Sequence, residues 1–263
     1  MSLVSDTHGK VAARLNTIQG ANPAETGVII LGDAGFNFWL NKTDQKAKSD
    51  ASNCGYHVYC VRGNHEQRPA LISTMRLVYD EEVNGEVYIE DEFPLIRYFV
   101  DGGIYTIGGH RCLVIGGAYS VDKYHRLEYA RLAGHSTSGW FESEQLTPEE
   151  REDISSNISG QKFDFVLTHT CPIHWEPSDL FLNFIDQSMV EKDMEVWLDE
   201  VRRSINWKIW CFGHFHQDRL ERPRVQQFYR RYESLDSIWN RWYDQRTIDN
   251  GTYYAVSPRY HFD

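Results

Sequence analysis

Short apolar runs alternate with polar segments along most of the chain, which is the pattern of an α/β protein. Most of these runs are continuously apolar, as in strands that are buried on both faces of a sheet. The glycine pair 108–109 separates two of the runs and predicts a hairpin turn. The predicted strands cover 3–5, 28–31, 57–61, 87–89, 104–107, 112–115, 163–167 and 208–212.

Helical periodicity is clearest at 189–205, where apolar residues recur every three or four positions and form one stripe. Thr147, followed by Pro148 and two glutamates, predicts the start of another helix. Weaker helical patterns cover 10–17 and 38–50.

Two regions lack a clear pattern. Residues 118–144 have little apolar periodicity, so we expect a long excursion between core strands, of a kind that often carries function. Residues 221–263 are rich in Arg and aromatic residues, which suits a packed edge strand or a partner interface, and we expect the edge strand. No Pro- or Ser-rich linker divides the chain. We therefore expect a single domain over 1–263, with a core over about 1–220 and a C-terminal extension over 221–263.

Composition narrows the functional classes. The 263-residue chain has 38 acidic and 27 basic residues and a formal net charge of −11, which argues against a protein that binds long nucleic acids. No apolar run is long enough for a membrane span, and the first residues lack a signal-peptide pattern. The five scattered cysteines contain no CxxC pair and indicate reduced core thiols. We expect a cytoplasmic protein with no membrane partner, and a homo-oligomer remains open.

Side chains that can bind a metal follow five of the predicted strands. Sites in open α/β sheets form at the carboxyl ends of strands, where such side chains would meet. Glycines at 32, 63 and 213 would let the backbone turn sharply there and approach a ligand closely. A single His at a strand end is more often structural, but the ordered set has no packing explanation. The set consists of Asp6, His8, Asp33, Asn64, His65, His169, His214 and His216.

The ordered series D-x-H, G-D, G-N-H-E, H and G-H-x-H resembles the motif series of calcineurin-like metallophosphoesterases, and it runs from Asp6 to His216. The turn at 116–118 and the segment 168–172 are also similar to small bacterial and phage members of that superfamily. The resemblance implies a four-layer αββα sandwich of two mixed β-sheets, with a dinuclear metal site at one edge.

The resemblance also implies a ligand set, in which Asp33 bridges the two metal ions. Mixed imidazole and oxygen ligands suit Mn, Fe, Zn, Co or Ni better than Mg or Ca, and we expect Mn. Two divalent ions against two carboxylates leave a local positive charge, which would attract an anion such as a phosphate ester. The implied ligands are Asp6, His8, Asp33 and His216 for the first ion, and Asp33, Asn64, His169 and His214 for the second.

These features predict a metal-dependent phosphoesterase that hydrolyses phosphate mono- or diesters, with a small ester or a nucleotide as substrate. A metal-bridging hydroxide would attack phosphorus in line. His65 is the expected general acid, next to the catalytic ligands Asp33 and Asn64. The candidate substrate contacts are Arg62, Lys123 and Arg126.

The sequence departs from the phosphoprotein-phosphatase branch after Asp33. That branch has an Asp three residues later, followed by an Arg, whereas Phe36 and Asn37 occupy these positions here. The usual orienting partner of His65 and one phosphate-binding Arg are therefore missing, which argues against a phosphoserine or phosphothreonine phosphatase. Arg62 matches the branch locally, but it suits a structural ion pair equally well.

Other folds and functions are less consistent with the sequence. Residues 214–218 contain the H-x-H-x-D pattern of metallo-β-lactamases, but Arg219 follows where that family has His. Neither a P-loop nor a dinucleotide-binding fingerprint is present. The remaining alternative is a catalytically idle metallophosphoesterase fold that serves as a binding or assembly module. The complete ligand series, together with His65, favours the enzyme.

Overall fold

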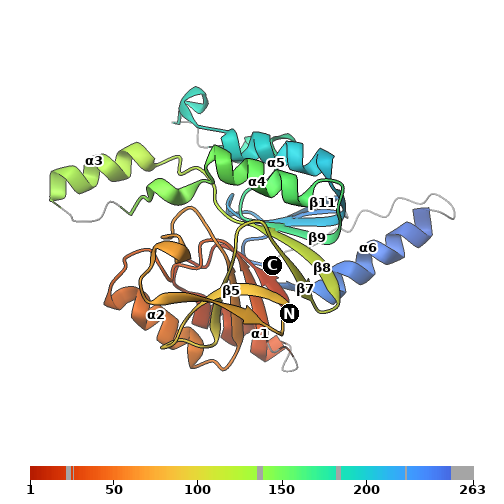
Figure 1. The fold of residues 1–263 in the computed structure, drawn as a ribbon, viewed down its shortest axis with the longest axis horizontal. Helices are drawn as coiled ribbons and strands as arrows, with labels where there is room; N and C mark the ends of the chain where they lie inside the picture. Colours follow the sequence, from red (N-terminus) through yellow and green to blue (C-terminus); the bar gives the residue numbers. More distant parts are fainter. Residues whose placement is uncertain (22–24, 26, 135–138, 182–184, 223, 250–263) are drawn as a thin grey trace, which may run out of the picture.

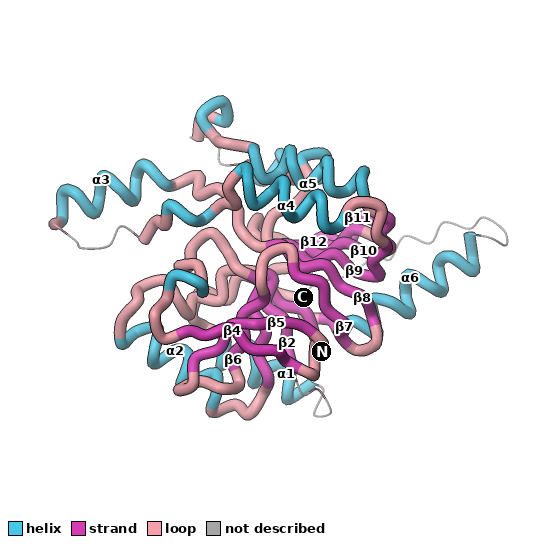
Figure 2. The backbone as a smooth tube through the Cα atoms, viewed as in Figure 1, coloured by secondary structure: helices cyan, strands magenta, loops and turns pink. Residues whose placement is uncertain are grey.

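The computed structural model describes residues 1–263 except 22–24, 26, 135–138, 182–184, 223 and 250–263. Two mixed β-sheets pack face to face, and helices cover both outer faces (Figure 1 and Figure 2). This arrangement confirms the expected αββα sandwich.

The first sheet has seven strands in the order β13-β1-β2-β3-β6-β5-β4. Its central strands β1, β2, β3 and β6 run parallel, and the remaining strands pair antiparallel. Because β1, β2 and β3 are parallel neighbours, their carboxyl ends lie at the same edge of the sheet. The strands are β1 (Ser2–Val4), β2 (Gly27–Leu31), β3 (His57–Val61), β4 (Met75–Asp80), β5 (Gly85–Glu90), β6 (Ile96–Phe99) and β13 (Glu233–Ser234).

The second sheet has six strands in the order β11-β12-β10-β9-β8-β7. Strands β12, β10, β9 and β8 run parallel, and the two edge strands pair antiparallel with their neighbours. The glycine pair 108–109 joins β7 to β8, as predicted. The strands are β7 (Gly103–Ile107), β8 (His110–Ile115), β9 (Lys162–Thr168), β10 (Asn206–Phe212), β11 (Arg219–Arg222) and β12 (Val225–Gln227).

Three apolar clusters hold the four layers together. The middle cluster lies between the sheets and includes Ile29 from β2 and Phe165 from β9. A second cluster joins the first sheet to α1 (Val11–Ala21) and α2 (Lys42–Ser52). The third joins the other sheet to α4 (Pro148–Ile158) and α5 (Asp193–Ser204). These continuous contacts on both faces explain why the strands read as uniformly apolar runs.

All eight predicted strands are present, and the structure adds others that the apolar pattern did not indicate. Strand β4 is an edge strand whose residues are mostly exposed, and β6 is short and interrupted by Arg97. Neither strand therefore shows a continuous apolar run. Arg97 pairs with Asp80 at the end of β4, so its charge is balanced within the sheet.

The four predicted helices are present, and they differ from the prediction only at their boundaries. Thr147 caps α4 through a reciprocal pair of bonds with Glu150, as predicted from the sequence. Helix α5 begins at Asp193, so the predicted start at 189 is wrong; an acidic first turn marks the true N-terminus. Short 3₁₀ turns cover Pro69–Leu71, Glu142–Glu144, Ile173–Trp175, Ser178–Leu180 and Gln187–Met189.

The expected excursion at 118–144 contains helix α3 (Lys123–Ala133), which projects away from the four layers (Figure 1). Of the residues of α3, only Ala130 is buried. A helix that buries so little has no apolar stripe, and its periodicity was therefore invisible in the sequence.

The expectation of an edge strand after residue 220 is only partly right. Strand β13 forms an edge of the first sheet, but the aromatic residues that follow lie on helix α6 (Leu235–Asp249). Ile238 and Trp242 of α6 pack into the cluster between the sheets, which accounts for the aromatic composition. The aromatic run at 253–256 lies outside the described residues.

The remaining composition-based predictions concern cysteines and membranes. All five cysteines are free thiols, and four of them are buried, in agreement with the prediction of reduced core residues. In the described part of the chain, no helix combines the length and the apolar character needed to cross a bilayer.

Candidate metal centre

The polar residues that follow five parallel strands meet at one edge of the two sheets. Backbone hydrogen bonds connect the loops: His8 N donates to Asp33 O over 2.9 Å, and Gly213 N donates to His169 O over 2.9 Å. The first bond joins two loops of the first sheet and the second joins two loops of the second sheet, while His214 N, which donates to Asp6 Oδ2 over 3.0 Å, connects the two sheets. We call the group the strand-end cluster; it consists of Asp6, His8, Asp33, Asn64, His169, His214 and His216.

Unusual backbone conformations are concentrated in the strand-end cluster. Only seven non-glycine residues in the described chain have a positive φ. This left-handed conformation costs roughly 1–2 kcal/mol per residue, and proteins keep such strain mainly at functional sites. Five of the seven belong to the cluster, namely Asp6, His8, Asp33, His214 and His216.

Two glycines bring the loops into close contact. A Cβ atom on Gly63 would lie 1.9 Å from Asp33 Oδ1, and one on Gly32 would lie 1.9 Å from His169 Nδ1. Gly32 also has a positive φ. A side chain at either position would therefore displace a member of the strand-end cluster, which gives the predicted glycine requirement a specific cause.

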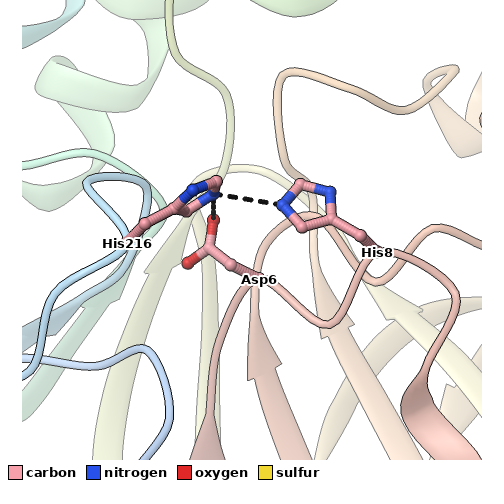
Figure 3. A group of neighbouring side chains, drawn as sticks. All are labelled: Asp6, His8 and His216. Carbon is pink, nitrogen blue, oxygen red and sulfur yellow. Dashed lines mark hydrogen bonds and ion pairs between the residues drawn. The ribbon is translucent and has the colours of Figure 1, made fainter. Parts of the chain in front are cut away.

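Asp6, His8 and His216 form the more exposed part of the cluster (Figure 3). The Nε2 atoms of His8 and His216 lie 3.1 Å apart, and His216 Nε2 lies 3.5 Å from Asp6 Oδ1. Asp6 Oδ1 is buried and has no hydrogen-bond partner among the described residues. One ligand atom from each residue therefore points at a common position, as a cation site requires.

Asp6, Asp33 and His169 form a buried group on the inner side of the cluster. His169 Nε2 lies 3.7 Å from Asp33 Oδ2 and 2.8 Å from Asn64 Oδ1. In both groups the candidate ligand atoms lie within 4.8 Å of one another, and Asp6 belongs to both. The shared carboxylate in this geometry is thus Asp6, whereas the sequence resemblance implies Asp33 as the bridge.

The protonation of His169 follows from its hydrogen bonds. Leu31 O can only accept, so His169 Nδ1, 2.8 Å away, must carry the proton. Burial lowers the pKa of His169, which keeps the imidazole neutral and leaves a lone pair on Nε2. Asn64 Nδ2 donates to Ser120 Oγ, and Asn64 Oδ1 lies 2.8 Å from His169 Nε2, which carries that lone pair. Two acceptors that face each other at 2.8 Å fit a site for a cation.

The carboxylates also fit a cation site. Burial, and then the negative charge of Asp6, raise the pKa of Asp33 to about 8. Burial favours the neutral form of Asp6, but the ion pair with His216 and the charges of nearby imidazoles outweigh burial, so the pKa of Asp6 is lowered. The ion pair with Asp6 raises the pKa of His216 in turn. Two buried carboxylates this close repel each other, and a divalent cation would remove that repulsion.

His214 is tied to Asp6 through its backbone. Its N–H donates to Asp6 Oδ2 over 3.0 Å, and its ring centroid lies 5.0 Å from that of His169. Burial lowers the pKa of His214 well below its usual value, so this imidazole is also neutral. A neutral imidazole is the form that binds metals.

His65 lies beside the cluster but outside both groups of candidate ligands. Its Nδ1 is buried without a hydrogen-bond partner among the described residues, and its Nε2 lies 3.3 Å from Asn64 Nδ2. Burial lowers the pKa of His65 to about 3. Phe36, which stands where the related branch has Asp, is fully buried in the apolar cluster beneath the first sheet. No carboxylate therefore orients His65 from that position.

The three candidate substrate contacts lie in different environments. The buried Arg62 pairs with Asp101 at 2.8 Å and donates to Glu144 O at 2.7 Å, which favours the structural interpretation. Lys123 Nζ lies 4.5 Å from the centroid of the Trp140 ring, outside the cavities at the cluster. Only Arg126 lines a cavity together with members of the cluster.

Two cavities flank the strand-end cluster and share Asp33, His65, Asp122 and His216. We call them the Trp39 cavity, of about 660 Å³, and the Glu195 cavity, of about 450 Å³. Both fall within the range of volumes typical of small-ligand sites. The cluster is therefore open to a small ligand from two sides.

Sequence analysis missed two residues that support the cluster. Ser120, just after the glycine turn at 116–118, fixes the amide of Asn64. Glu66 accepts hydrogen bonds from Gly35 N at 2.7 Å and Gly63 N at 3.3 Å, and so connects the loops of Asp33 and Asn64. Glu66 ends the G-N-H-E motif, a signal that could have indicated it; Ser120 has no comparable signal.

Comparison with known proteins agrees with this arrangement. The model of the calcineurin-like phosphoesterase family matches residues 3–218, which include the whole strand-end cluster. No curated protein matches the chain.

Proposed function

Because the chain belongs to the calcineurin-like phosphoesterase family, we propose that it hydrolyses small phosphate esters with the help of two divalent metal ions. The observation that carries this proposal is the pair of acceptors on His169 and Asn64, which face each other at 2.8 Å among two buried carboxylates. A buried arrangement of this kind is unfavourable without a cation.

The residues of the strand-end cluster would hold the metal ions in two groups. Following the ligand set that the resemblance implies, Asp6, His8, Asp33 and His216 would bind one ion and Asp33, Asn64, His169 and His214 the other, and Asp6 also lies within reach of the second group. Nitrogen and oxygen donors together suit first-row transition metals, and we expect Mn. When bound, the ions would supply an activated water for attack on phosphorus and stabilise the charge on the phosphoryl oxygens.

His65 is the group best placed to donate a proton to the leaving oxygen. It lines both cavities, and its Nε2 lies next to Asn64 within the centre. A pKa of about 3 makes the imidazole neutral at pH 7 before the substrate binds. A negatively charged phosphoryl group next to the ring favours the protonated form, so substrate binding would load His65 with the proton it donates.

The surroundings of the centre favour a small substrate in the cytoplasm. The net charge of −11 opposes binding of long nucleic acids. The free cysteines suit the reducing cytoplasm. Phe36 and Asn37 also leave the chain without the residues that the phosphoserine and phosphothreonine phosphatases use.

Hydrolysis of p-nitrophenyl phosphate and bis-p-nitrophenyl phosphate, with Mn²⁺, Zn²⁺, Co²⁺, Ni²⁺ or Fe²⁺ added to chelator-treated protein, tests the proposal. We expect metal-dependent turnover and tight uptake of close to two ions per chain. Asp33→Asn should lower kcat/KM by more than the roughly 10–100-fold typical of outer-shell changes. Asp164→Asn, which removes a carboxylate paired with Lys208 on the second sheet, is the matched control.

The two possible failures have different meanings. Tight metal uptake without turnover of either ester would favour the catalytically idle binding module. Absence of tight uptake of any of these ions would overturn the metal-dependent function itself.

A further inference from the structure

We propose that the Trp39 cavity binds the nucleobase of a nucleotide whose phosphate lies at the strand-end cluster. This inference rests on the proposed function, because the cluster is what would hold the phosphate. It goes further in naming the substrate class, a nucleoside phosphate ester.

An aromatic wall leads from the cluster into the cavity. Phe38 and Trp39 both line it, with ring centroids 4.7 Å apart and planes nearly perpendicular at 88°. The Phe38 ring lies 6.3 Å from the ring of His65. A group attached to the leaving oxygen that His65 protonates would therefore extend along these two rings.

Trp39 is exposed to a degree that needs an explanation. Its side chain is 50% accessible, next to a cavity that opens onto the candidate metal centre. Large exposed apolar groups beside a cavity are typical of ligand sites. A flat indole face can stack on a base of any sequence.

A fixed cation completes the aromatic wall. The Arg126 guanidinium lies 5.5 Å from the centroid of the Phe38 ring. Its Nε donates to Asp122 over 2.6 Å, and its Nη1 donates to Gly139 O over 3.2 Å. These bonds hold the planar guanidinium in place, and such a group stacks on bases and binds phosphate oxygens.

The charges around the two cavities favour the Trp39 side. In that cavity Asp44 accepts from two backbone N–H groups, and Asp50 pairs with Lys46. Lys10 contributes a further cation with no ion-pair partner among the described residues. Lys10 therefore adds positive charge to the Trp39 cavity, which suits an anionic ligand.

The Glu195 cavity is acidic by comparison. It is lined by Glu176, Glu191 and Glu195, and its lysine, Lys192, is already paired with Glu176 at 2.7 Å. An anionic ligand would be repelled there. The Trp39 cavity is also the larger, and Thr43 on its wall offers a polar partner for the edge of a base.

Calorimetric titration with AMP and with ribose 5-phosphate tests the assignment, because the two ligands differ only by the base. Both are titrated into the full chain in the presence of a chelator, which prevents turnover of either ester during the measurement. We expect AMP to bind at least about fivefold more tightly than ribose 5-phosphate, the lower end of what one stacked base contributes.

Variants locate the effect within the cavity. Trp39→Ala should reduce the ratio of the two affinities to near one and leave the affinity for ribose 5-phosphate unchanged. Tyr79→Ala removes a similarly exposed aromatic residue, 61% accessible and outside both cavities, and should keep the wild-type ratio. Circular dichroism checks that each variant is folded. The ratio of affinities measured on the wild-type protein tests the inference even if a variant fails to fold.

The outcomes separate this inference from the proposed function. Equal affinities for AMP and ribose 5-phosphate in the wild type, with intact hydrolysis of bis-p-nitrophenyl phosphate, would overturn the nucleobase site alone. Phenyl phosphate that binds as tightly as AMP would also overturn it, in favour of a general aromatic site. Failure of metal uptake and hydrolysis would overturn the proposed function. The ratio of the affinities for AMP and ribose 5-phosphate, measured in chelator, would still test whether the Trp39 cavity binds a base.

Discussion

The imidazoles of the candidate centre differ in how their second nitrogen is held. The carbonyl oxygen of Leu31 accepts from Nδ1 of His169 and orients that ring, so that its Nε2 faces the centre. The buried Nδ1 of His65 has no such partner among the described residues. A fixed ring with a defined tautomer suits a metal ligand, whereas a ring whose other nitrogen is unpaired is free to change protonation.

This difference predicts the behaviour of a His65→Asn variant. We expect kcat to fall by about 100-fold or more for alkyl phosphate esters, because general acid catalysis contributes that much. The loss should be smaller for p-nitrophenyl esters, whose leaving group departs readily without a proton. Metal content, measured by elemental analysis, should stay at the wild-type value.

The exposed His125 on α3 provides the control for that measurement, and His125→Asn should change neither rate nor metal content. Loss of a metal ion from His65→Asn would contradict the assigned role and make His65 a ligand.

At the scale of elements, the loops rather than the strands carry the chemistry. Each loop leaves a parallel strand, turns within one or two residues and presents a ligand atom, which explains the left-handed backbone at five cluster positions. Glu66 then connects two of these loops through the backbone N–H groups of Gly35 and Gly63. The geometry of the centre therefore depends on how tightly neighbouring loops can pack.

A Gly63→Ala variant should show this dependence. Its Cβ would lie 1.9 Å from Asp33 Oδ1 and 2.3 Å from Asp33 N, so either Asp33 or the loop must move. We expect a loss of roughly 1–3 kcal/mol in the free energy of unfolding, as for other overpacked positions, and weaker metal uptake. Urea unfolding and metal titration measure the two effects.

Gly20→Ala is the matched control, since no atom lies within 4 Å of a Cβ built on this residue of α1. Replacing glycine within a helix should stabilise the chain by about 0.5–1 kcal/mol and leave metal uptake unchanged. Equal metal affinity in the two variants would contradict the tight packing of the loops.

The whole molecule buries several carboxyl groups that hold protons in the absence of metal. Burial, and then the charge of Asp6, raise the pKa of Asp33 to about 8; burial, and then Asp33, raise that of Glu66 to about 7. Burial also raises the pKa of Glu195 to about 7. In the unfolded chain these groups ionise near their usual values of 3.8 and 4.5.

Metal-free protein should therefore become less stable between pH 6.5 and pH 8. Over that window the folded state binds more protons than the unfolded state, so the free energy of unfolding falls as the pH rises. The histidines whose pKa is lowered by folding affect the free energy of unfolding mainly below pH 6.5. There the unfolded state binds more protons than the folded state, so their contribution makes stability rise with pH. Thermal unfolding in chelator across this range measures the effect.

Saturating Mn²⁺ should weaken this pH dependence, because a bound cation favours the ionised form of Asp33 and holds it in the folded state. A melting temperature that rises between pH 6.5 and pH 8 in chelator would contradict the prediction.

The sequence by itself determined the central strands of both sheets except β6 and β12, most of the helices and the order of the candidate ligands. Strands buried on both faces must be apolar throughout, and a helix that packs on a sheet must carry a stripe, so both leave a local record. The cap at Thr147 could likewise be predicted, because it depends only on residues that are close in the sequence. Helix α3 and strands β4 and β6 left no such record because they bury little or are interrupted by charge.

Only the tertiary structure decided which distant residues meet. Arg62 and Arg126 look alike in the sequence, but one is buried in an ion pair with Asp101 and the other lines a cavity at the centre. The same holds for Asp6, whose place in both groups of candidate ligands depends on how two sheets pack. Periodicity reports whether a residue is buried. It cannot report which partner lies across a packed interface, because that is set by contacts between residues far apart in the chain.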